Sequence, residues 1–437
     1  MKTQNSDGRI IAIVTMLFLF AMISFVTNLA APIGVIWKNT YQGNSENTVG
    51  MLGNAMNFLA YLFMGIPAGK MLRAFGYKRT ALIGIALGFV GVFIQYLSGR
   101  FGVDNQNAGF ATYLTGAFVA GFSVCILNTV VNPMLNLLGG GGNRGNQLNL
   151  LGATFNSLAG MLTPLFVGAL IGEVTKRTAM MQVYPVLYIA MLVFLLAFVI
   201  ISFIPIKDPE LGRTTKETVF EHSAWSFRHF VLGAVSIFVY VGVEVGIPGT
   251  LFYYISDKTI NGAGVGGNAV AIAGSVAATY WCMMLIGRFS AGFIAGRISS
   301  KSMLLFATST GMVLIAAAML LGNSMSVMMP VFKGNEFDMV TVPIAALLLV
   351  LCGLFTSIMW SCIFNLATEG LGKYTASASG IFMMMVVGGG ILPLLQNFMA
   401  DHQGYLLSYI IPLLGMAFMF YYALKGHQNV NRDIPIV

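Results

Sequence analysis

The stretch YPVLYIAMLVFLLAFVIISFI at residues 184–204 decides the fold class, because it contains no charged residue. A helix needs about 20 mostly apolar residues to cross ~30 Å of hydrocarbon. A second run, from Ile10 to Trp37, has the same character. The strands of a membrane β-barrel would instead alternate in polarity over segments of about 10 residues. The two runs therefore predict membrane-spanning helices.

The composition extends this interpretation to most of the chain. Hydrophobic residues make up 57% of the 437 residues and charged residues only 9%, whereas soluble domains carry roughly 25% charged residues. A water-soluble fold could not hide so much apolar surface. The four cysteines lie inside apolar runs without paired spacing, so we expect buried thiols rather than disulfides or metal ligands.

Polar residues, glycines and prolines divide the apolar runs into twelve spans, six on either side of a polar segment. The spans are 10–37, 47–69, 79–99, 108–137, 147–172, 182–205, 228–256, 267–295, 302–322, 341–366, 375–399 and 404–424. The polar segment, 207–227, predicts a cytoplasmic linker and includes KDPELGRTTKETVFEHS. We therefore expect a six-helix bundle at 1–206 and a second one at 228–437.

The basic residues predict the orientation of the chain. Twelve spans place both termini on one side of the membrane. If that side is the cytoplasm, sixteen of the 23 Lys and Arg residues lie on cytoplasmic segments and six on outer ones, with Arg288 inside a span. This bias follows the positive-inside rule. The net charge of +8 is then a topology signal, and we expect no nucleic-acid partner.

Two correspondences indicate that the two halves are related. GIPAGKML at 65–72 matches GFIAGRIS at 292–299, and Pro164 in the fifth span corresponds to Pro393 in the eleventh. Both pairs lie about half the chain apart, at equivalent spans. They predict a pseudo-symmetric internal repeat.

Two six-helix halves with a parallel repeat are the architecture of the major facilitator fold, in which the substrate lies between the halves near the bilayer midplane. The loop GKMLRAFGYKR at 69–79 resembles that superfamily's signature, although Arg73 and Ala74 stand where the family often has an Asp-Arg pair. We expect an all-α membrane protein with twelve transmembrane helices in two pseudo-symmetric six-helix bundles. Basic residues near this loop and its counterpart either set the topology, gate the pathway or bind helix C-terminal carbonyls: Lys70, Arg73, Lys78 and Arg297.

Longer stretches resemble the fucose, glucose and galactose branch of this superfamily, typified by bacterial fucose:proton symporters. The stretches are PAGKMLRAFGYK (67–78), LNTVVNPMLNLLG (127–139), NLLGATFNSLAG (149–160), YVGVEVGIPG (240–249), IGRFSAG (286–292), SIMWSCIFNLATEGLGKYTASASG (357–380) and GGGILPLLQNFMAD (388–401). The resemblance implies a bacterial inner-membrane importer of hexose-like sugars, often coupled to protons.

Two positions depart from the fucose symporters. Those proteins carry a buried aspartate shortly after an Asn-Leu step in the first span and a glutamate before a T-x-x-N-P segment in the fourth. The corresponding residues here are Ala31 and Asn128. The mechanism of the fucose symporters therefore cannot be carried over intact.

Two ionisable residues remain inside the spans, Glu244 in the seventh and Arg288 in the eighth. A charge in hydrocarbon is costly, so such residues mark proton or substrate pathways. Glu244 is the candidate proton carrier, with a structural anchor as the alternative. Arg288 either pairs with a carboxylate, caps carbonyls, gates the pathway or contacts an anionic substrate. The sequence does not decide whether it pairs with Glu244, because their depths differ by a turn or two.

A sugar needs neutral donors and acceptors for its hydroxyls and a flat apolar surface for its C–H faces. Carboxamides can donate and accept together, and Tyr and Trp supply the surface. For each of these residues, packing or interhelical hydrogen bonding is the alternative. The candidates are Asn28, Asn54, Asn57, Asn128, Asn132, Asn156, Tyr240, Trp281, Trp360 and Asn365.

We therefore expect a sugar importer that works by alternating access with protons as the coupling ion, in the bacterial inner membrane. A facilitative uniporter and an importer of an anionic or acetylated sugar remain open. An exporter of drugs or metabolites, or a non-transporting membrane sensor, fits the sequence less well. We expect no enzyme activity, no cofactor and no metal site. The expected partners are the sugar, protons and the lipid bilayer, and the expected state is a monomer.

Overall fold

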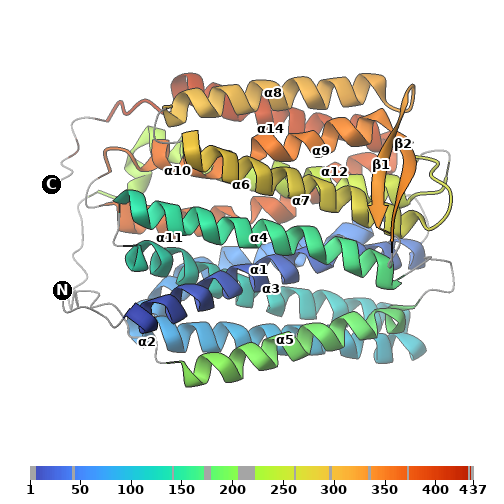
Figure 1. The fold of residues 1–437 in the computed structure, drawn as a ribbon, viewed down its shortest axis with the longest axis horizontal. Helices are drawn as coiled ribbons and strands as arrows, with labels where there is room; N and C mark the ends of the chain where they lie inside the picture. Colours follow the sequence, from blue (N-terminus) through green and yellow to red (C-terminus); the bar gives the residue numbers. More distant parts are fainter. Residues whose placement is uncertain are drawn as a thin grey trace.

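The computed structural model describes residues 6–41, 45–139, 142–171, 179–204, 222–259, 262–294, 298–332, 336–371, 374–431 and 434. Long helices run side by side, with one β-hairpin at an end of the bundle (Figure 1). In this part of the chain, twelve helical segments are long and apolar enough to cross a membrane. The predicted number of spans is confirmed.

The first half of the chain, which we call the N-half, forms five long helices. They are α1 (Ser6–Thr40), α2 (Glu46–Asp104), α3 (Gln106–Leu138), α4 (Gly142–Ile171) and α5 (Tyr184–Phe203), with a short 3-10 helix η1 (Met180–Val183) before α5. Helix α2 contains two spans, because Gly76 has a φ of 76° and a ψ of 177°. That left-handed conformation favours glycine and turns the chain back on itself.

The second half, the C-half, has more breaks. It contains α6 (Arg228–Ser256), α7 (Ala269–Ile294), α8 (Ser300–Leu321), α9 (Ile344–Thr356), α10 (Met359–Thr368), α11 (Thr375–Met385), α12 (Gly388–Gln403), α13 (Tyr405–Ser408), α14 (Ile410–Tyr421) and a terminal π-helical turn (Tyr422–Gly426). The tenth span joins α9 to α10, and the eleventh joins α11 to α12. Of the predicted linker, 207–221 lie outside the described residues, and η2 (Ala224–Ser226) lies just before α6.

Glycines explain how α12 packs closely against α6 of its own half and α2 of the N-half. A Cβ at Gly388 would lie 1.9 Å from the carbonyl oxygen of Phe238 on α6, and one at Gly390 would lie 2.8 Å from that of Ala55 on α2. Neither position can hold a larger residue without moving a backbone. The run Gly388–Gly390 therefore allows the close packing that the sequence suggests.

The sequence analysis missed a β-hairpin and placed the start of the tenth span too early. Strands β1 (Ser326–Phe332) and β2 (Phe337–Pro343) pair antiparallel, with Ser326 opposite Pro343, so residues 341–343 belong to a strand. The backbone N–H of Phe332 donates to Ser275 Oγ of α7 at 3.0 Å, and its ring lies 5.7 Å from that of Phe166 on α4. The hairpin thus reaches from the C-half to the N-half.

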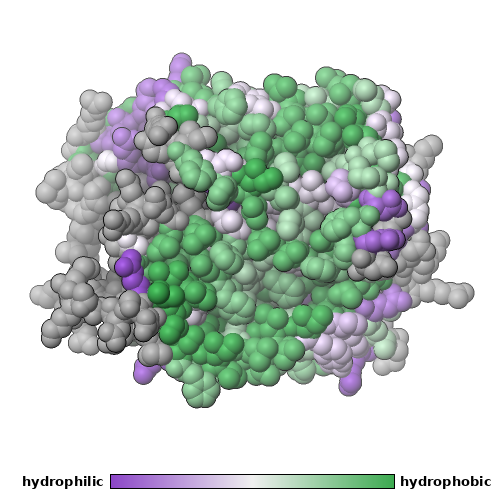
Figure 2. All heavy atoms as spheres, viewed as in Figure 1, coloured by the Kyte–Doolittle hydropathy of each residue, from purple (hydrophilic) through white to green (hydrophobic). Residues whose placement is uncertain are grey.

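The surface shows which part of the molecule faces lipid. Figure 2 shows hydrophobic residues across the middle of this face and hydrophilic residues gathered toward its two ends. Leu320 on α8 is 86% exposed, and other large apolar side chains along α5 and α8 are also exposed. In water such a belt would be unstable, so the exposed residues support a bilayer as the solvent.

Cysteine labelling tests the orientation with a matched pair of serines at the two ends of α8. Ser302 lies in its first turn and Ser324 follows its last, and both are exposed. With the N-terminus in the cytoplasm, α8 begins inside and ends outside. We expect an impermeant thiol reagent added to intact cells to label Ser324→Cys and not Ser302→Cys, with the unaltered chain giving the background. The reverse pattern would contradict the orientation.

Candidate functional site

A small cavity lies between the two halves. Its wall is shared equally by the halves, with helices α1, α2 and α4 on one side and α6 and α7 on the other. Three of the predicted substrate residues, Asn28, Asn54 and Trp281, belong to this wall. The lining residues are Thr27, Asn28, Ala31, Met51, Asn54, Pro164, Val245, Pro248, Gly249, Phe252, Ala277 and Trp281.

The two asparagines give this mostly apolar wall a polar edge. Asn28 Nδ2 donates to the carbonyl oxygen of Ser24 at 2.9 Å, one turn earlier on α1. Asn54 is buried, and its Nδ2 donates to the carbonyl oxygen of Gly389 at 2.9 Å, which joins α2 to α12 in the other half. A few fixed amides among apolar side chains are typical of a site for a small polar ligand.

Trp281 on α7 supplies the flat surface of the cavity. Its indole lies edge-on to Tyr280, with ring centroids 5.7 Å apart. Gly160 of α4 lies close to this indole, since a Cβ at that position would be 3.0 Å from Trp281 Cδ2. Glycine at that position leaves room for the indole, so a tryptophan from the C-half packs directly against the N-half.

An ion pair joins the same two C-half helices next to the cavity, just before the lining residue Val245 on α6 and two turns after Trp281 on α7. Arg288 Nη2 on α7 is 3.2 Å from Glu244 Oε1 on α6, and both side chains are largely buried. Arg288 Nη1 donates to the carbonyl oxygen of Ala153 at 2.8 Å and to Ser157 Oγ at 2.7 Å, both on α4. The pairing that the sequence left open is therefore formed. The same guanidinium also connects the two halves, using the planar fork of donors that lysine lacks.

Tyr240 and Trp360 lie beside this pair. Tyr240 is buried one helical turn before Glu244, on the same face of α6. Its ring centroid lies 6.2 Å from that of Trp360 on α10. Neither residue lines the cavity.

Comparison with known proteins agrees with this architecture. The family model described as Major Facilitator Superfamily matches residues 13–393. The chain belongs to the major facilitator superfamily. It is a multi-pass membrane transporter and not an enzyme, as the sequence analysis predicts.

Individual relatives align with this protein over most of its length. A glucose/galactose transporter of Brucella abortus is 30% identical over 437 residues, covering 98% of this chain and 97% of its own. The L-fucose-proton symporter of Escherichia coli is 24% identical, covering 87% and 85%. A crystal structure of the Escherichia coli fucose:proton symporter superposes with a TM-score of 0.67 at 20% identity, over 97% of this chain and all of that one. The predicted branch of the superfamily is confirmed.

The remaining asparagines of this major facilitator chain have partners within the N-half. Asn128 Nδ2 donates to the hydroxyl of Tyr61 at 2.7 Å, and Asn156 Nδ2 donates to the carbonyl oxygen of Phe20 at 3.1 Å. Asn132 Nδ2 donates to the carbonyl oxygen of Asn128. The bonds of Asn128 and Asn156 join different helices and favour an interhelical role for these two residues, whereas the Asn132 bond stays within α3. Asn57 differs, because its buried Oδ1 has no hydrogen-bond partner among the described residues.

Other predicted residues lie away from the cavity. Asn365 is exposed and lines a separate pocket with Ser300 and Lys301. Lys78 Nζ donates to the carbonyl oxygens of Ser202 and Ile204, each at 2.8 Å, at the end of α5. That contact is the C-terminal carbonyl binding that the basic loop predicts.

The described part of the structure assigns no contact to three further basic residues of the predicted set. Lys70 is exposed. The side chain of Arg73 and the whole of Arg297 lie outside the described residues. Their predicted gating role remains a prediction.

The sequence analysis missed a polar network at the end of the bundle where α1 ends. It joins residues of both halves: Lys38, Asn47, Thr48, Asp257, Asp401 and Tyr405. The sequence analysis used Lys38 only as one of the six outer basic residues and assigned no role to Asp401. A lysine directly after a long apolar run was the available signal, because only a nearby partner makes its burial tolerable.

Removing one member of the central ion pair tests its structural contribution. Arg288→Met leaves the Glu244 carboxylate buried and unpaired, which in proteins costs about 3–5 kcal/mol. We expect this variant to unfold at a clearly lower temperature in detergent than the wild-type chain. The double variant Glu244→Gln with Arg288→Met removes both charges and should recover part of the loss. Equal midpoints for the single and double variants would contradict a coupled pair.

Proposed function

We propose that this chain is a secondary active transporter that imports a hexose-like sugar by alternating access. The observation that carries the proposal is the cavity shared equally by the two halves, with amides on one side and an indole on the other. A sugar presents hydroxyls at its edge and C–H groups on its faces, which Asn28, Asn54 and Trp281 can contact together. The names of the relatives, glucose/galactose transporter and fucose-proton symporter, support a sugar as the substrate.

We further propose that protons drive the import and that Glu244 carries them. The carboxylate holds one arm of Arg288, whose other arm holds α4 of the N-half. A proton on Glu244 removes the charge that positions this arginine. The contact between the halves then becomes weaker or changes partner, which links proton binding to the movement of the halves.

The contacts of this ion pair bear on whether the substrate is neutral or anionic. The Arg288 guanidinium already bonds one carboxylate, one carbonyl and one hydroxyl. An anionic sugar would have to displace Glu244 to reach it. The geometry therefore favours a neutral sugar over a sialic acid, and a uniporter is the outcome expected if Glu244 carries no proton.

The cellular setting follows from the same proposals. The relatives are bacterial proteins, and the basic residues favour a cytoplasmic N-terminus. We propose that the protein resides in the bacterial inner membrane with both termini in the cytoplasm. The cavity lies wholly within one chain, so we propose a functional monomer with a sugar and protons as its partners.

Uptake into proteoliposomes tests the substrate and the driving force. We expect one or more neutral hexoses from a panel to accumulate when the outside is more acidic than the lumen, and only to equilibrate without the gradient. Protein-free liposomes are the control. If no sugar or sugar acid enters, the substrate proposal is wrong, and if entry ignores the gradient, the protein is a uniporter.

The variant Glu244→Gln tests the coupling residue. Glutamine keeps the shape and the hydrogen bond toward Arg288 but carries no titratable proton. We expect accumulation driven by the gradient to be lost while exchange of labelled for unlabelled sugar continues. Glu369→Gln, at an exposed acid beyond α10, should behave as the wild type. Unchanged accumulation in Glu244→Gln would remove that residue from the coupling role.

A further inference from the structure

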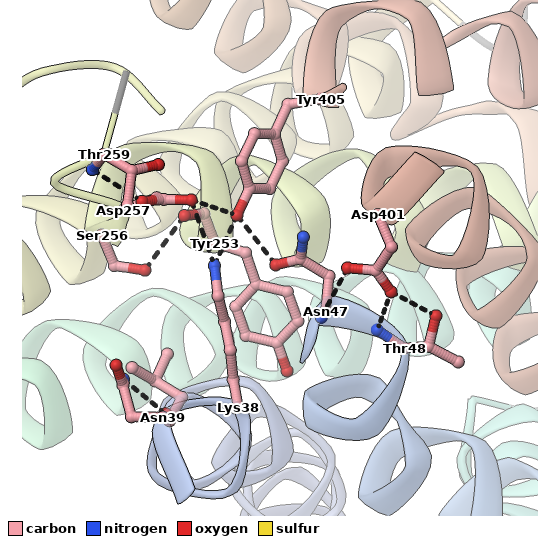
Figure 3. Close-up of polar contacts among 11 residues, drawn as sticks. Lys38, Asn39, Asn47, Thr48, Tyr253, Ser256, Asp257, Thr259, Asp401 and Tyr405 are labelled. Atoms are coloured by element: carbon pink, nitrogen blue, oxygen red, sulfur yellow. Dashed lines mark hydrogen bonds and ion pairs between the residues drawn. The ribbon is translucent and has the colours of Figure 1, made fainter. Parts of the chain in front are cut away.

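A lysine from the N-half is held by two groups of the C-half where α1 ends (Figure 3). Lys38 Nζ lies 3.5 Å from Asp257 Oδ2 and donates to the hydroxyl of Tyr405. That hydroxyl lies 2.9 Å from Asp257 Oδ2 and 2.8 Å from Asn47 Oδ1 of the N-half, and its single proton can go to either. Lys38 is buried, so these partners replace the water that its charge would otherwise hold.

A carboxylate of the C-half also caps a helix of the N-half. Asp401, in the last turn of α12, accepts from the backbone N–H groups of Asn47 and Thr48 at 2.8 Å each. Its Oδ2 accepts from Thr48 Oγ1 as well, at 2.5 Å. These are first-turn donors of α2, whose own N-cap residue, Ser45, makes no side-chain cap bond. The missing cap is therefore supplied from the other half, with a charge that suits a helix N-terminus.

A tyrosine fills the space beneath these bonds. Tyr253 of α6 is fully buried. A Cβ at Gly34 of α1 would lie 2.2 Å from its hydroxyl oxygen, and one at Gly50 of α2 would lie 3.0 Å from it. Two glycines of the N-half thus leave the gap into which the C-half inserts a ring. Lys38 Nζ also lies 5.8 Å from the centre of that ring.

These contacts lie directly over one end of the cavity. Lys38 follows the lining residue Ala31 on α1, and Asn47 precedes Asn54 on α2. Seven residues of helix correspond to roughly 10 Å. In the orientation that the basic residues predict, this is the outer end. A solute could enter from outside only after the two halves separate here.

We propose that these residues form an outer clamp that holds the transporter closed to the outside, and that the clamp must open for each solute to enter. The clamp consists of Lys38, Asn47, Thr48, Tyr253, Asp257, Asp401 and Tyr405. The inference rests on the proposed alternating access and orientation, but it assigns a further role to residues outside the cavity. Apart from the Tyr405–Asp257 bond, which lies within the C-half, every bond described for it crosses between the halves, so separation of the outer ends breaks these bonds together.

The charge state of Asp257 supports an ionic clamp. Burial by itself would raise the pKa of Asp257, but the Lys38 ammonium and the hydrogen bonds from Thr259 and Tyr405 outweigh burial and hold that pKa below its usual range. Asp257 lies just beyond the end of α6, outside the span. The carboxylate is therefore charged at neutral pH, and its contribution to closure is lost only as the pH falls through the lowered pKa.

Labelling of a cysteine inside the cavity tests the clamp. The reporter is Ala31→Cys in the full chain with Cys282→Ser, and the reagent is an impermeant thiol reagent added outside. The labelling rate follows the fraction of molecules open to the outside. We expect Asp401→Asn to raise this rate about three- to tenfold, because it weakens charge-assisted bonds that only the closed state makes. Tyr405→Phe, which removes only a hydroxyl, should give a smaller rise.

Asp338→Asn is the matched control, because it makes the same change at an exposed residue of β2 outside the clamp. Its labelling rate should equal that of the reporter alone. If Asp401→Asn does not reach the membrane folded, Tyr405→Phe decides. Rates equal to that of Asp338→Asn in the folded clamp variants would overturn the clamp. The assay needs no substrate, so this failure is distinct from a failure to transport sugar.

Discussion

The hydrocarbon around these helices offers no hydrogen-bond partner, so the partners of polar groups within the spans have to come from inside the bundle. This constraint decides where the helices meet. Asn54 reaches the carbonyl of Gly389, Asn397 reaches Thr250 Oγ1, and Arg288 reaches two acceptors on α4. Two of these three contacts join the halves. The same side chains that would be costly alone in lipid therefore act as the points where the N-half and C-half recognise each other.

Close packing in lipid depends on small residues, because lipid tails are as apolar as the side chains that they contact. Glycines accordingly occur where the halves come closest. Gly160 leaves room for Trp281, Gly34 and Gly50 leave room for Tyr253, and Gly390 lets α12 approach α2. In each contact an aromatic ring or a backbone segment packs against the backbone of a glycine, which has no side chain. They can separate as rigid surfaces without repacking a core, which suits halves that rock against each other.

The sequence predicted the features that depend on local composition and left out those that depend on distant contacts. The number of spans and the buried ionisable residues follow from hydropathy, because each span has to be apolar enough by itself to lie in lipid. The pairing of Glu244 with Arg288 and the capping of α2 by Asp401 join residues that no spacing rule connects. The hairpin at 326–343 was missed because its strand residues continue into the apolar helix α9. Lys38 illustrates the limit, since its side chain counts as a topology charge until its partners are known.

The outer clamp has to be strong enough to close the cavity and weak enough to open in each cycle. A hydrogen bond to a charged group contributes about 1.5–3 kcal/mol, whereas the buried Lys38–Asp257 pair contributes little net, because the cost of desolvating both charges offsets much of their attraction. The Tyr405 hydroxyl has one proton for two acceptors, so the bonds drawn around it cannot all form at once. The three bonds that Asp401 accepts then sum to roughly 5–9 kcal/mol, about the size of the ~5.5 kcal/mol that moves a two-state equilibrium from 1:99 to 99:1. A ligand shifts this equilibrium only by the difference between its binding free energies for the open and the closed state. A clamp of this size can therefore be opened by a ligand that prefers the open state by a comparable free energy, and its bonds form again when the halves close.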